Sequence, residues 1–167
     1  ILGFVRAADK INVALGEDLG GNAEQAIRHV GKLVDIFKVK EKYGLEEGLN
    51  KVGSAINALG AASTANEAFL VEFSKRIGGI APNANIAIAD VLGLAATLDQ
   101  LGQTAEVSTT ALGQLLVAFA QDMPKFARIA GLSVQDFSDL LANDANGALL
   151  KVLEGAKSTE GGLASMA

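Results

Sequence analysis

The sequence LEEGLNKVGSAINALG, residues 45–60, repeats its large apolar residues at alternating intervals of four and three. That spacing places the apolar side chains along one side of an α-helix, and Glu46 and Glu47 in the first turn favour the helix through its dipole. The pattern lasts for only two heptads, which is too short for an isolated coiled coil. It therefore predicts a helix that packs on another helix of the same chain. The apolar residues are Leu45, Leu49, Val52, Ile56 and Leu59.

Helix-forming sequence continues on both sides of this stretch. Ala and Leu are abundant, only two Pro interrupt the chain, and no alternating pattern typical of a strand competes. We expect an all-α fold of about seven or eight helices, packed as antiparallel helical hairpins. The other helices are expected near residues 1–15, 22–43, 64–80, 85–101, 104–123 and 145–157, with short pieces near 124–130 and 133–141.

Capping residues mark where these helices begin and end. The expected starts are Asn22 with Gln25, Ser63 or Thr64 with Glu67, Asn83 or Asn85, and Ser133 with Asp136. The expected ends are Gly16, Gly44, Gly60, Gly102 and Gly131. Pro124 suits the first turn of a helix, because that turn needs no N–H from it.

The middle of the chain is almost uncharged. Only Asp90, Asp99 and Glu106 carry charge between Ile77 and Gln121. A neutral stretch of this length is either core or a surface covered by a partner. Because the helices near 86–101 and 112–119 are apolar on most sides, we expect them at the centre of the fold.

We expect residues 1–157 to form one helical core domain, with N-terminal helices in 1–44 and the main bundle in 45–157. Residues 158–167 are rich in Gly and Ser and are expected to form a flexible tail. The first residue is Ile rather than Met. We therefore expect the chain to be a fragment of a longer protein.

Composition argues against several functions. The net charge is −5, from 14 basic and 19 acidic residues, which disfavours specific nucleic-acid binding through a basic surface. The chain has no Cys, so disulfides and thiol chemistry are excluded. No apolar run reaches the ~18 residues that a membrane-spanning helix needs.

Residues with chemical potential do not form a recognisable active site. His29 is the only histidine, and a metal site would need further ligands of its kind. The paired carboxylates are expected at helix starts, where they interact with the dipole, and sugar-binding aromatics are scarce. We therefore expect no catalytic, cofactor-binding or metal-binding residues, no cofactor and no enzymatic activity. The carboxylate pairs are Glu17/Asp18, Glu46/Glu47 and Asp136/Asp139.

Two further patterns, the Gly-Gly pairs and a run of lysines, are expected to have structural roles. The Gly-Gly pairs lack the Gly-Lys-Ser/Thr of a phosphate loop and are expected to be hinges or caps. Lys38, Lys40 and Lys42 alternate with other residues, Glu41 among them, so we expect a solvated helix end. The pairs are Gly20-Gly21, Gly78-Gly79 and Gly161-Gly162.

Four segments, in order, resemble the tape measure proteins of long-tailed phages and prophages. FSKRIGGIA (73–81) is similar to that family's helix ending in a Gly-Ala-rich turn, and VLGLAATLDQLG (91–102) to its Ala/Leu helix closed by Leu-Gly. FARIAGLSVQDF (126–137) resembles its Phe-Ala…Ala-Gly-Met-Ser…Phe segment, with Leu132 in place of Met. NDANGALLKVLEG (143–155) resembles the end of its core domain, with Ala145 where Pro is frequent.

The resemblance implies a structural virion protein. Such proteins are long and helix-rich, lie in the lumen of the tail tube, and set tail length by their own length. It implies partners among the tail tube protein, the tail assembly chaperones and other tail proteins, with assembly in the bacterial host cytoplasm. It leaves a homo-oligomer and contact with the host membrane open.

Two alternatives remain open at this point. One is a helical adaptor that uses its neutral middle as a groove for a partner helix. The other is a membrane-active segment, in which residues 84–98 and 111–120 insert as a helical hairpin.

Overall fold

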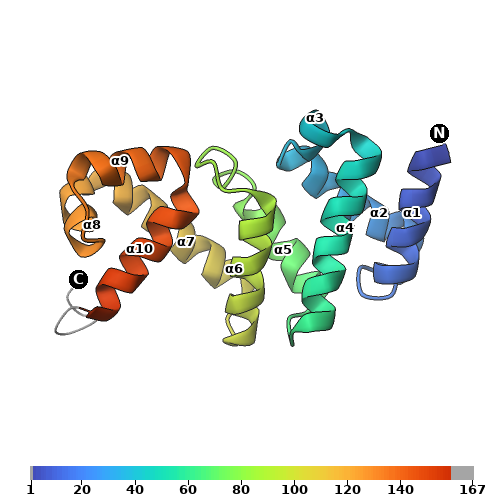
Figure 1. Cartoon of the computed structure of the whole chain (residues 1–167). Coiled ribbons are helices and arrows are strands. Elements are labelled where there is room, and N and C mark those ends of the chain that lie inside the picture. Colours follow the sequence, from blue (N-terminus) through green and yellow to red (C-terminus); the bar gives the residue numbers. More distant parts are fainter. Residues whose placement is uncertain (1, 159–167) are drawn as a thin grey trace. The chain divides into compact units, whose positions relative to one another are not determined.

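The computed structural model describes residues 2–158, and the described residues contain α-helices and no strand (Figure 1). The predicted all-α class is confirmed, although residues 2–158 form ten helices rather than about seven or eight. They are α1 (Leu2–Leu15), α2 (Ala23–Ile36), α3 (Val39–Tyr43), α4 (Leu45–Ala62), α5 (Glu67–Ile77), α6 (Ile88–Gln100), α7 (Ala105–Gln121), α8 (Met123–Ile129), α9 (Val134–Asn143) and α10 (Ala145–Ser158).

The described residues group into two compact units. The first comprises residues 2–82 and 87–109, and the second comprises residues 83–86 and 110–158. Helix α7 begins in the first unit and ends in the second. Each unit has its own buried apolar residues.

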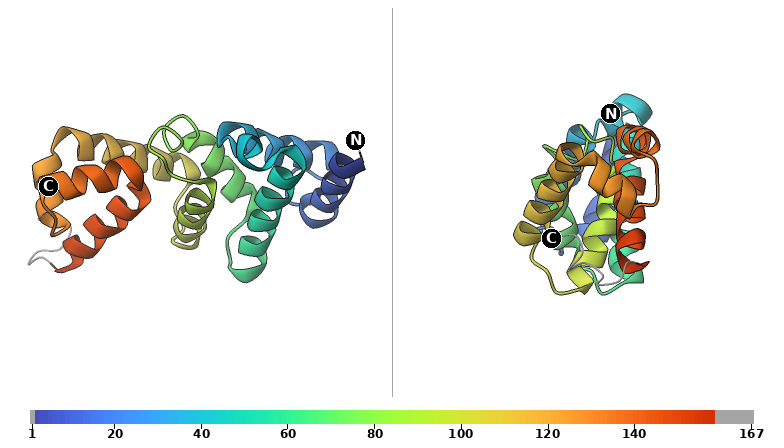
Figure 2. Two further views of the ribbon diagram at one scale, coloured as in Figure 1. Left: turned by 45° about the horizontal axis from the view of Figure 1, so that its top comes forward. Right: turned by 90° about the vertical axis from the view of Figure 1, so that its left-hand side faces the viewer.

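Helix α4, the helix of the heptad pattern, is the centre of the first unit. It packs against α1, α2, α3, α5 and α6, and Figures 1 and 2 show it beside α1 and α2. Leu49, Val52 and Ile56 are buried as the pattern predicts, whereas Leu45 at its start is 47% exposed. The surrounding helices add further fully buried side chains to this core, among them Leu15, Leu33, Leu70, Phe73, Ile77 and Leu92.

Three phenylalanines form the core of the second unit. The ring of Phe119 lies edge-on to Phe126 at 4.7 Å and to Phe137 at 5.6 Å between centroids, a favourable aromatic geometry. These rings come from α7, α8 and α9, and Figures 1 and 2 show α8, α9 and α10 side by side. Helix α10 comes so close to α8 that a Cβ on Gly155 would overlap the carbonyl oxygen of Ile129.

Several predicted helix boundaries are confirmed in atomic detail. The side chain of Asn22 accepts a hydrogen bond from the Gln25 N–H at 3.0 Å, and Ser133 accepts one from the Asp136 N–H at 3.1 Å. Pro124 lies in the first turn of α8. Gly102 and Gly131 end helices with positive φ, which glycine adopts without steric cost.

The predicted helix near 22–43 is wrong in one respect, because it is divided into α2 and α3. Lys38 takes the left-handed conformation, with φ of 53°, and ends the hydrogen-bond ladder there. Nothing local in the sequence marks this break, since lysine is a good helix former. The break redirects the chain so that Val39 becomes buried.

Two other predicted starts and one stop also differ. Helix α4 continues past Gly60 to Ala62, and α5 is capped by Asn66, which accepts from Ala68 N–H at 2.8 Å. Ser63 instead donates back to the Leu59 carbonyl, an interaction that competes with capping. Helix α6 begins at Ile88, not near Asn83 or Asn85.

Asn85 serves a different purpose. It adopts φ of 55°, and its side-chain amide donates to the Ala142 carbonyl at 2.7 Å. This bond satisfies a carbonyl near the end of α9 and holds residues 83–86 within the second unit.

The predicted central position of residues 86–101 is not confirmed. Helix α6 buries Val91, Leu92 and Ala95 on one face, whereas Leu101 is 68% exposed. Apolar composition on all sides is therefore not evidence of complete burial here, because the number of neighbouring helices decides how many faces are covered. In α7, Val117 is likewise 53% exposed while Phe119 is buried.

Candidate functional site

The only histidine lies in a contact between two helices. His29 on α2 is half-buried, and its Nδ1 lies 3.4 Å from Nζ of Lys75 on α5. Partial burial first, and then the Lys75 charge, lower the pKa of His29 below its usual 6.5. Glu72 pairs with Lys75 and with Arg76, and the hydrogen bond from Arg76 lowers the pKa of Glu72.

This contact has the features of a structural bridge. An ammonium can only donate, so Nδ1 of His29 must be unprotonated to accept from Lys75. Within residues 2–158, no group of His, Asp and Glu is arranged to hold a metal ion. The arrangement therefore links α2 to α5 without bringing His29 to a nucleophile or a metal ligand.

The paired carboxylates lie on separate elements. Glu46 and Glu47 are in the first turn of α4, as predicted, and Glu47 pairs with Lys51 at 3.2 Å. Glu17 and Asp18 were expected at a helix start, but they lie in the turn that follows α1. Of the third pair, Asp136 is in the first turn of α9, and Asp139 accepts from the side chain of Gln135.

The glycine pairs occupy turns. Gly20 and Gly21 have φ of 119° and 77°, which glycine allows and other residues resist. Gly78 and Gly79 follow the end of α5. The pair at 161–162 lies outside the described residues.

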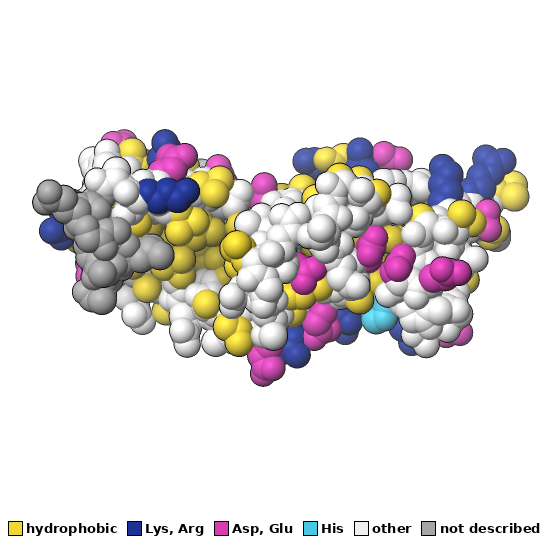
Figure 3. Space-filling model, turned by 90° about the horizontal axis from the view of Figure 1, so that it is seen from below, with side chains coloured by type: hydrophobic (Ala, Val, Ile, Leu, Met, Phe, Trp, Pro, Cys, Tyr) yellow, Lys and Arg dark blue, Asp and Glu magenta, His cyan; other side chains and the backbone are white. Residues whose placement is uncertain are grey.

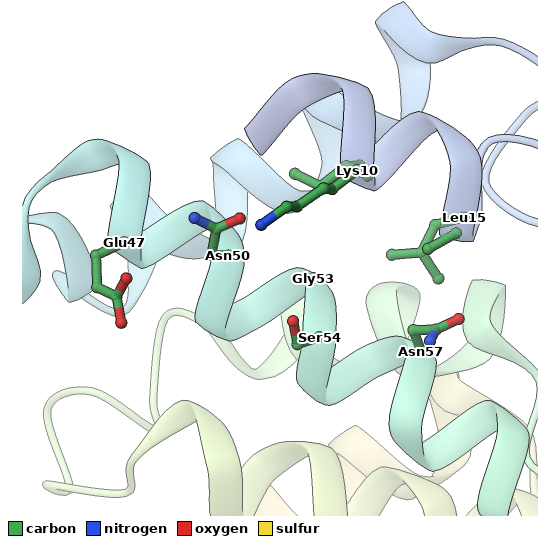
Figure 4. A pocket seen from close by; sticks show the side chains of 9 residues that line it. Lys10, Leu15, Glu47, Asn50, Gly53, Ser54 and Asn57 are labelled. Carbon is green, nitrogen blue, oxygen red and sulfur yellow. The ribbon is translucent and has the colours of Figure 1, made fainter. Parts of the chain in front are cut away.

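A cleft of about 290 Å³ lies between α1 and α4, and its lining combines polar and apolar residues (Figure 4). Lys10 from α1 faces Asn50 from α4, and Ser54 and Asn57 continue the same wall (Figure 4). Gly53 keeps the helices close at the base, since a Cβ there would lie 3.1 Å from Cγ1 of Ile11.

The cleft can donate and accept hydrogen bonds, but it does not assemble acid-base chemistry. Ser54 has no histidine in the lining to activate it, as nucleophilic catalysis by serine requires. Glu47, the one carboxylate in the lining, lies at the far end from Asn57 in Figure 4.

A second pocket of about 290 Å³ has a different character and is the candidate site of the first unit. We call it the Tyr43 pocket. Its walls are apolar and come from the α2–α3 break, from α4 and from the start of α6, and three lysines join the lining. The lining residues are Phe37, Lys38, Val39, Lys42, Tyr43, Lys51, Val52, Ala55, Ala87, Ile88, Ala89 and Leu92.

Two of the three lysines of this pocket lie over the ring of its tyrosine. Nζ of Lys42 lies 5.1 Å and Nζ of Lys51 lies 4.9 Å from the centroid of the Tyr43 ring, within the range of cation–π attraction. The ring is 44% exposed. The tertiary structure thus adds Tyr43 and Lys51 to a lysine run that the sequence suggested was only a solvated helix end.

Sequence reasoning missed the Tyr43 pocket because its walls are distant in the chain. The one available signal was that the only tyrosine directly follows Lys42. The contribution of α4 and α6 could not be read from spacing, since it depends on how those helices pack.

The visible surface carries charges of both signs. On the face in Figure 3, the described acidic and basic side chains are scattered singly or in small groups, without a continuous basic area. Apolar side chains gather over the C-terminal helices in the same view. Within residues 2–158 no helix is both long and apolar enough to cross a bilayer.

Comparison with known proteins identifies a family. The model of a family described as phage-related minor tail protein matches residues 1–166. Neither a curated protein nor a solved structure matches the chain.

Proposed function

Because this chain belongs to the family of phage-related minor tail proteins, a structural tail component, we propose that it is a segment of a tape measure protein. In that role its length contributes to the length of the tail, and it takes part in tail assembly and DNA delivery. The proposal also holds that the segment carries no catalytic, cofactor or metal site.

The observation that carries the proposal is the way the helices follow one another. Helices pack with their neighbours along the chain, as in α1 with α2 and α9 with α10, and also with helices two or three elements away, as in α1 with α4. The described residues form two units of nearly consecutive residues. A ruler needs physical extent rather than chemistry, and a helix contributes ~1.5 Å per residue. The four sequence segments that resemble tape measure proteins support the same role.

The proposed location is the lumen of the tail tube, after assembly in the bacterial cytoplasm. The proposed partners are the tail tube protein, the tail assembly chaperones and other tail proteins. The net charge of −5 suits a lumen through which DNA passes, because a net negative charge disfavours nonspecific binding to the phosphate backbone.

The test is an in-frame deletion and a tandem duplication of residues 1–157 in the phage that carries the gene. We expect shorter and longer tails in electron micrographs, and a change of at most about 235 Å if every residue contributes as extended helix. A control phage carries an unrelated helical segment of equal length in place of residues 1–157 and should keep the parental tail length. Unchanged tail length after both deletion and duplication would exclude the ruler role.

The same phages separate the ruler from the adaptor. An adaptor that only recruits a partner would lose infectivity on deletion and keep its tail length. Lipid vesicles separate both from a membrane-active hairpin, because such a hairpin would release dye from vesicles of phosphatidylethanolamine and phosphatidylglycerol.

A further inference from the structure

We propose that the Tyr43 pocket binds a large apolar side chain carried on an acidic segment of another protein. This inference goes beyond the ruler role, since a pocket of this kind can act whether or not the chain sets tail length. It rests on the shape of the pocket, on the charges around it and on the backbone conformation of Lys38.

The pocket has the size and lining of an anchor site. Its volume is about 290 Å³, just below the ~300–1,000 Å³ of small-molecule pockets. Val52, Ile88 and Leu92 form apolar walls from two helices. A site of this size suits one or two side chains, as the anchors of protein interfaces do.

The charge around the pocket favours a partner with acidic residues on either side of the bound apolar side chain. Lys38, Lys42 and Lys51 line it, and no Asp or Glu does. Lys51 is paired with Glu47, but neither Lys38 nor Lys42 forms an ion pair with any residue in 2–158. In a chain of net charge −5, such a cluster attracts acidic sequence and repels basic sequence.

The nearby acids lie outside the lining of the pocket. Glu41 directly precedes Lys42 but does not line the pocket. Asp35 is paired with Lys40, which does not line the pocket. Asp90 follows Ala89 on α6 and is not part of the lining. The pocket therefore keeps a positive rim on the side formed by α3.

Lys38 also holds the pocket open through its backbone. Its φ of 53° costs a non-glycine residue roughly 1–2 kcal/mol. The break that it makes separates α2 from α3 and lets Phe37, Val39 and Tyr43 face the same space. Such strain at a residue that also supplies charge to a pocket is typical of a binding site.

The binding test uses the intrinsic fluorescence of the protein. Tyr43 is the only tyrosine and there is no Trp, so the signal comes from the pocket itself. The probes are two alanine-rich helical peptides with blocked ends and without Tyr or Trp. Each peptide carries two leucines one helical turn apart. Glutamates flank the leucines in the first peptide, and lysines flank them in the second. We expect the glutamate peptide to change the emission and to bind with a dissociation constant of about 100 µM or tighter. Its affinity should decrease several-fold when the salt concentration rises from about 0.05 to about 0.5 M.

Two variants with matched controls locate the binding. Lys42→Glu should lower the affinity for the glutamate peptide by about tenfold. Lys10→Glu replaces an exposed lysine on α1 and should leave that affinity within about twofold of the wild type. Ala89→Leu fills the pocket from α6 and should abolish binding. Ala58→Leu adds the same atoms to an exposed part of α4 outside the pocket and should not.

Three outcomes would overturn the proposal. One is that the lysine peptide binds as well as the glutamate peptide. Another is that neither peptide changes the emission at millimolar concentration. The third is that sedimentation shows self-association, abolished by Ala89→Leu, in a chain that ignores both peptides, which would assign the pocket to a second copy. None of these outcomes depends on tail length, so they leave the ruler test separate.

Discussion

Asp99 on α6 accepts a hydrogen bond at 2.7 Å from the backbone N–H of Asn66, the residue that caps α5. The two residues are 33 positions apart in the sequence. The carboxylate thus lies at the positive end of the α5 dipole, where a negative charge is stabilising. One of the three charges in the neutral middle of the chain is therefore used to join two helices of the first unit.

Replacement of this carboxylate should destabilise the first unit. We expect Asp99→Ala to lower the free energy of unfolding by about 1–3 kcal/mol, because it removes a charge-assisted hydrogen bond to the backbone. Urea unfolding monitored by circular dichroism measures the change. Asp9→Ala on the exposed side of α1 is the control and should stay within about 0.5 kcal/mol of the wild type. Equal effects of the two substitutions would mean that the Asp99 bond contributes nothing in solution.

The His29–Lys75 contact should make stability depend on pH. The pKa of His29 is lowered in the folded chain, so the unfolded chain binds a proton at a higher pH than the folded chain does. Stability is therefore complete above 6.5 and decreases as the pH falls from there toward the folded-state pKa. His29→Gln should remove this component, seen as a flatter melting temperature between about pH 7 and pH 5.

Glu72 provides the comparison for that experiment. Its pKa is lowered from 4.5, mainly by the hydrogen bond from Arg76. Its contribution is present above 4.5 and is lost as the pH falls below that value. Glu72→Gln should therefore keep the slope that begins near neutral pH, and because the Glu72 charge raises the His29 pKa, the slope should extend to lower pH in this variant. A slope near neutral pH that survives in His29→Gln would contradict the assignment to the histidine.

Two glycine substitutions should have opposite signs. Gly155→Ala should destabilise the second unit by about 1–3 kcal/mol or more, since the new Cβ would overlap the Ile129 carbonyl oxygen. Gly93→Ala lies inside α6 with nothing within 4 Å of the new Cβ, so it should stabilise by about 0.5–1 kcal/mol. Differential scanning calorimetry of both variants checks the signs. A stabilised Gly155→Ala variant would show that α8 and α10 are further apart than described.

The phenylalanine cluster should hold the second unit together. Phe137→Ala leaves a cavity beside Phe119 and should lower the stability of that unit by about 3–5 kcal/mol. Hydrogen exchange followed by mass spectrometry should then show that, relative to the wild type, exchange accelerates more in residues 110–158 than in residues 2–82. Phe4→Ala is the control, because Phe4 is 43% exposed. Unchanged protection of residues 110–158 in Phe137→Ala would mean that the cluster is not their core.

Lys38→Gly should separate stability from binding. Glycine accepts the positive φ of this position, so the variant should be up to about 1 kcal/mol more stable. It should also bind the glutamate peptide more weakly, because one cation of the Tyr43 pocket is lost. Lys40→Gly, inside α3, should instead be destabilised by roughly 1 kcal/mol. A Lys38→Gly variant that is less stable than the wild type would argue against strain at this residue.

Most of the helices followed from the sequence, for local reasons. The cap at Asn22, the cap at Ser133 and the position of Pro124 depend on residues within one turn of each other. The apolar spacing in residues 45–60 likewise predicted the buried face of α4.

Two of the departures from prediction are left-handed backbone conformations. Lys38 takes one that lysine disfavours, and Asn85 takes one that asparagine tolerates better than most residues. Asn85 is held by the Ala142 carbonyl, 57 positions away. No window of neighbouring residues contains that information.

The chain by itself determined that it is helical, where most helices begin and end, and which side of each helix is apolar, because these properties come from interactions within a turn or two. Only the tertiary structure decided that α4 packs against more helices than α6 does, and that Lys51 lies over the ring of Tyr43 at an apolar pocket. Burial and pocket shape are sums over distant neighbours, and packing alone brings those neighbours together.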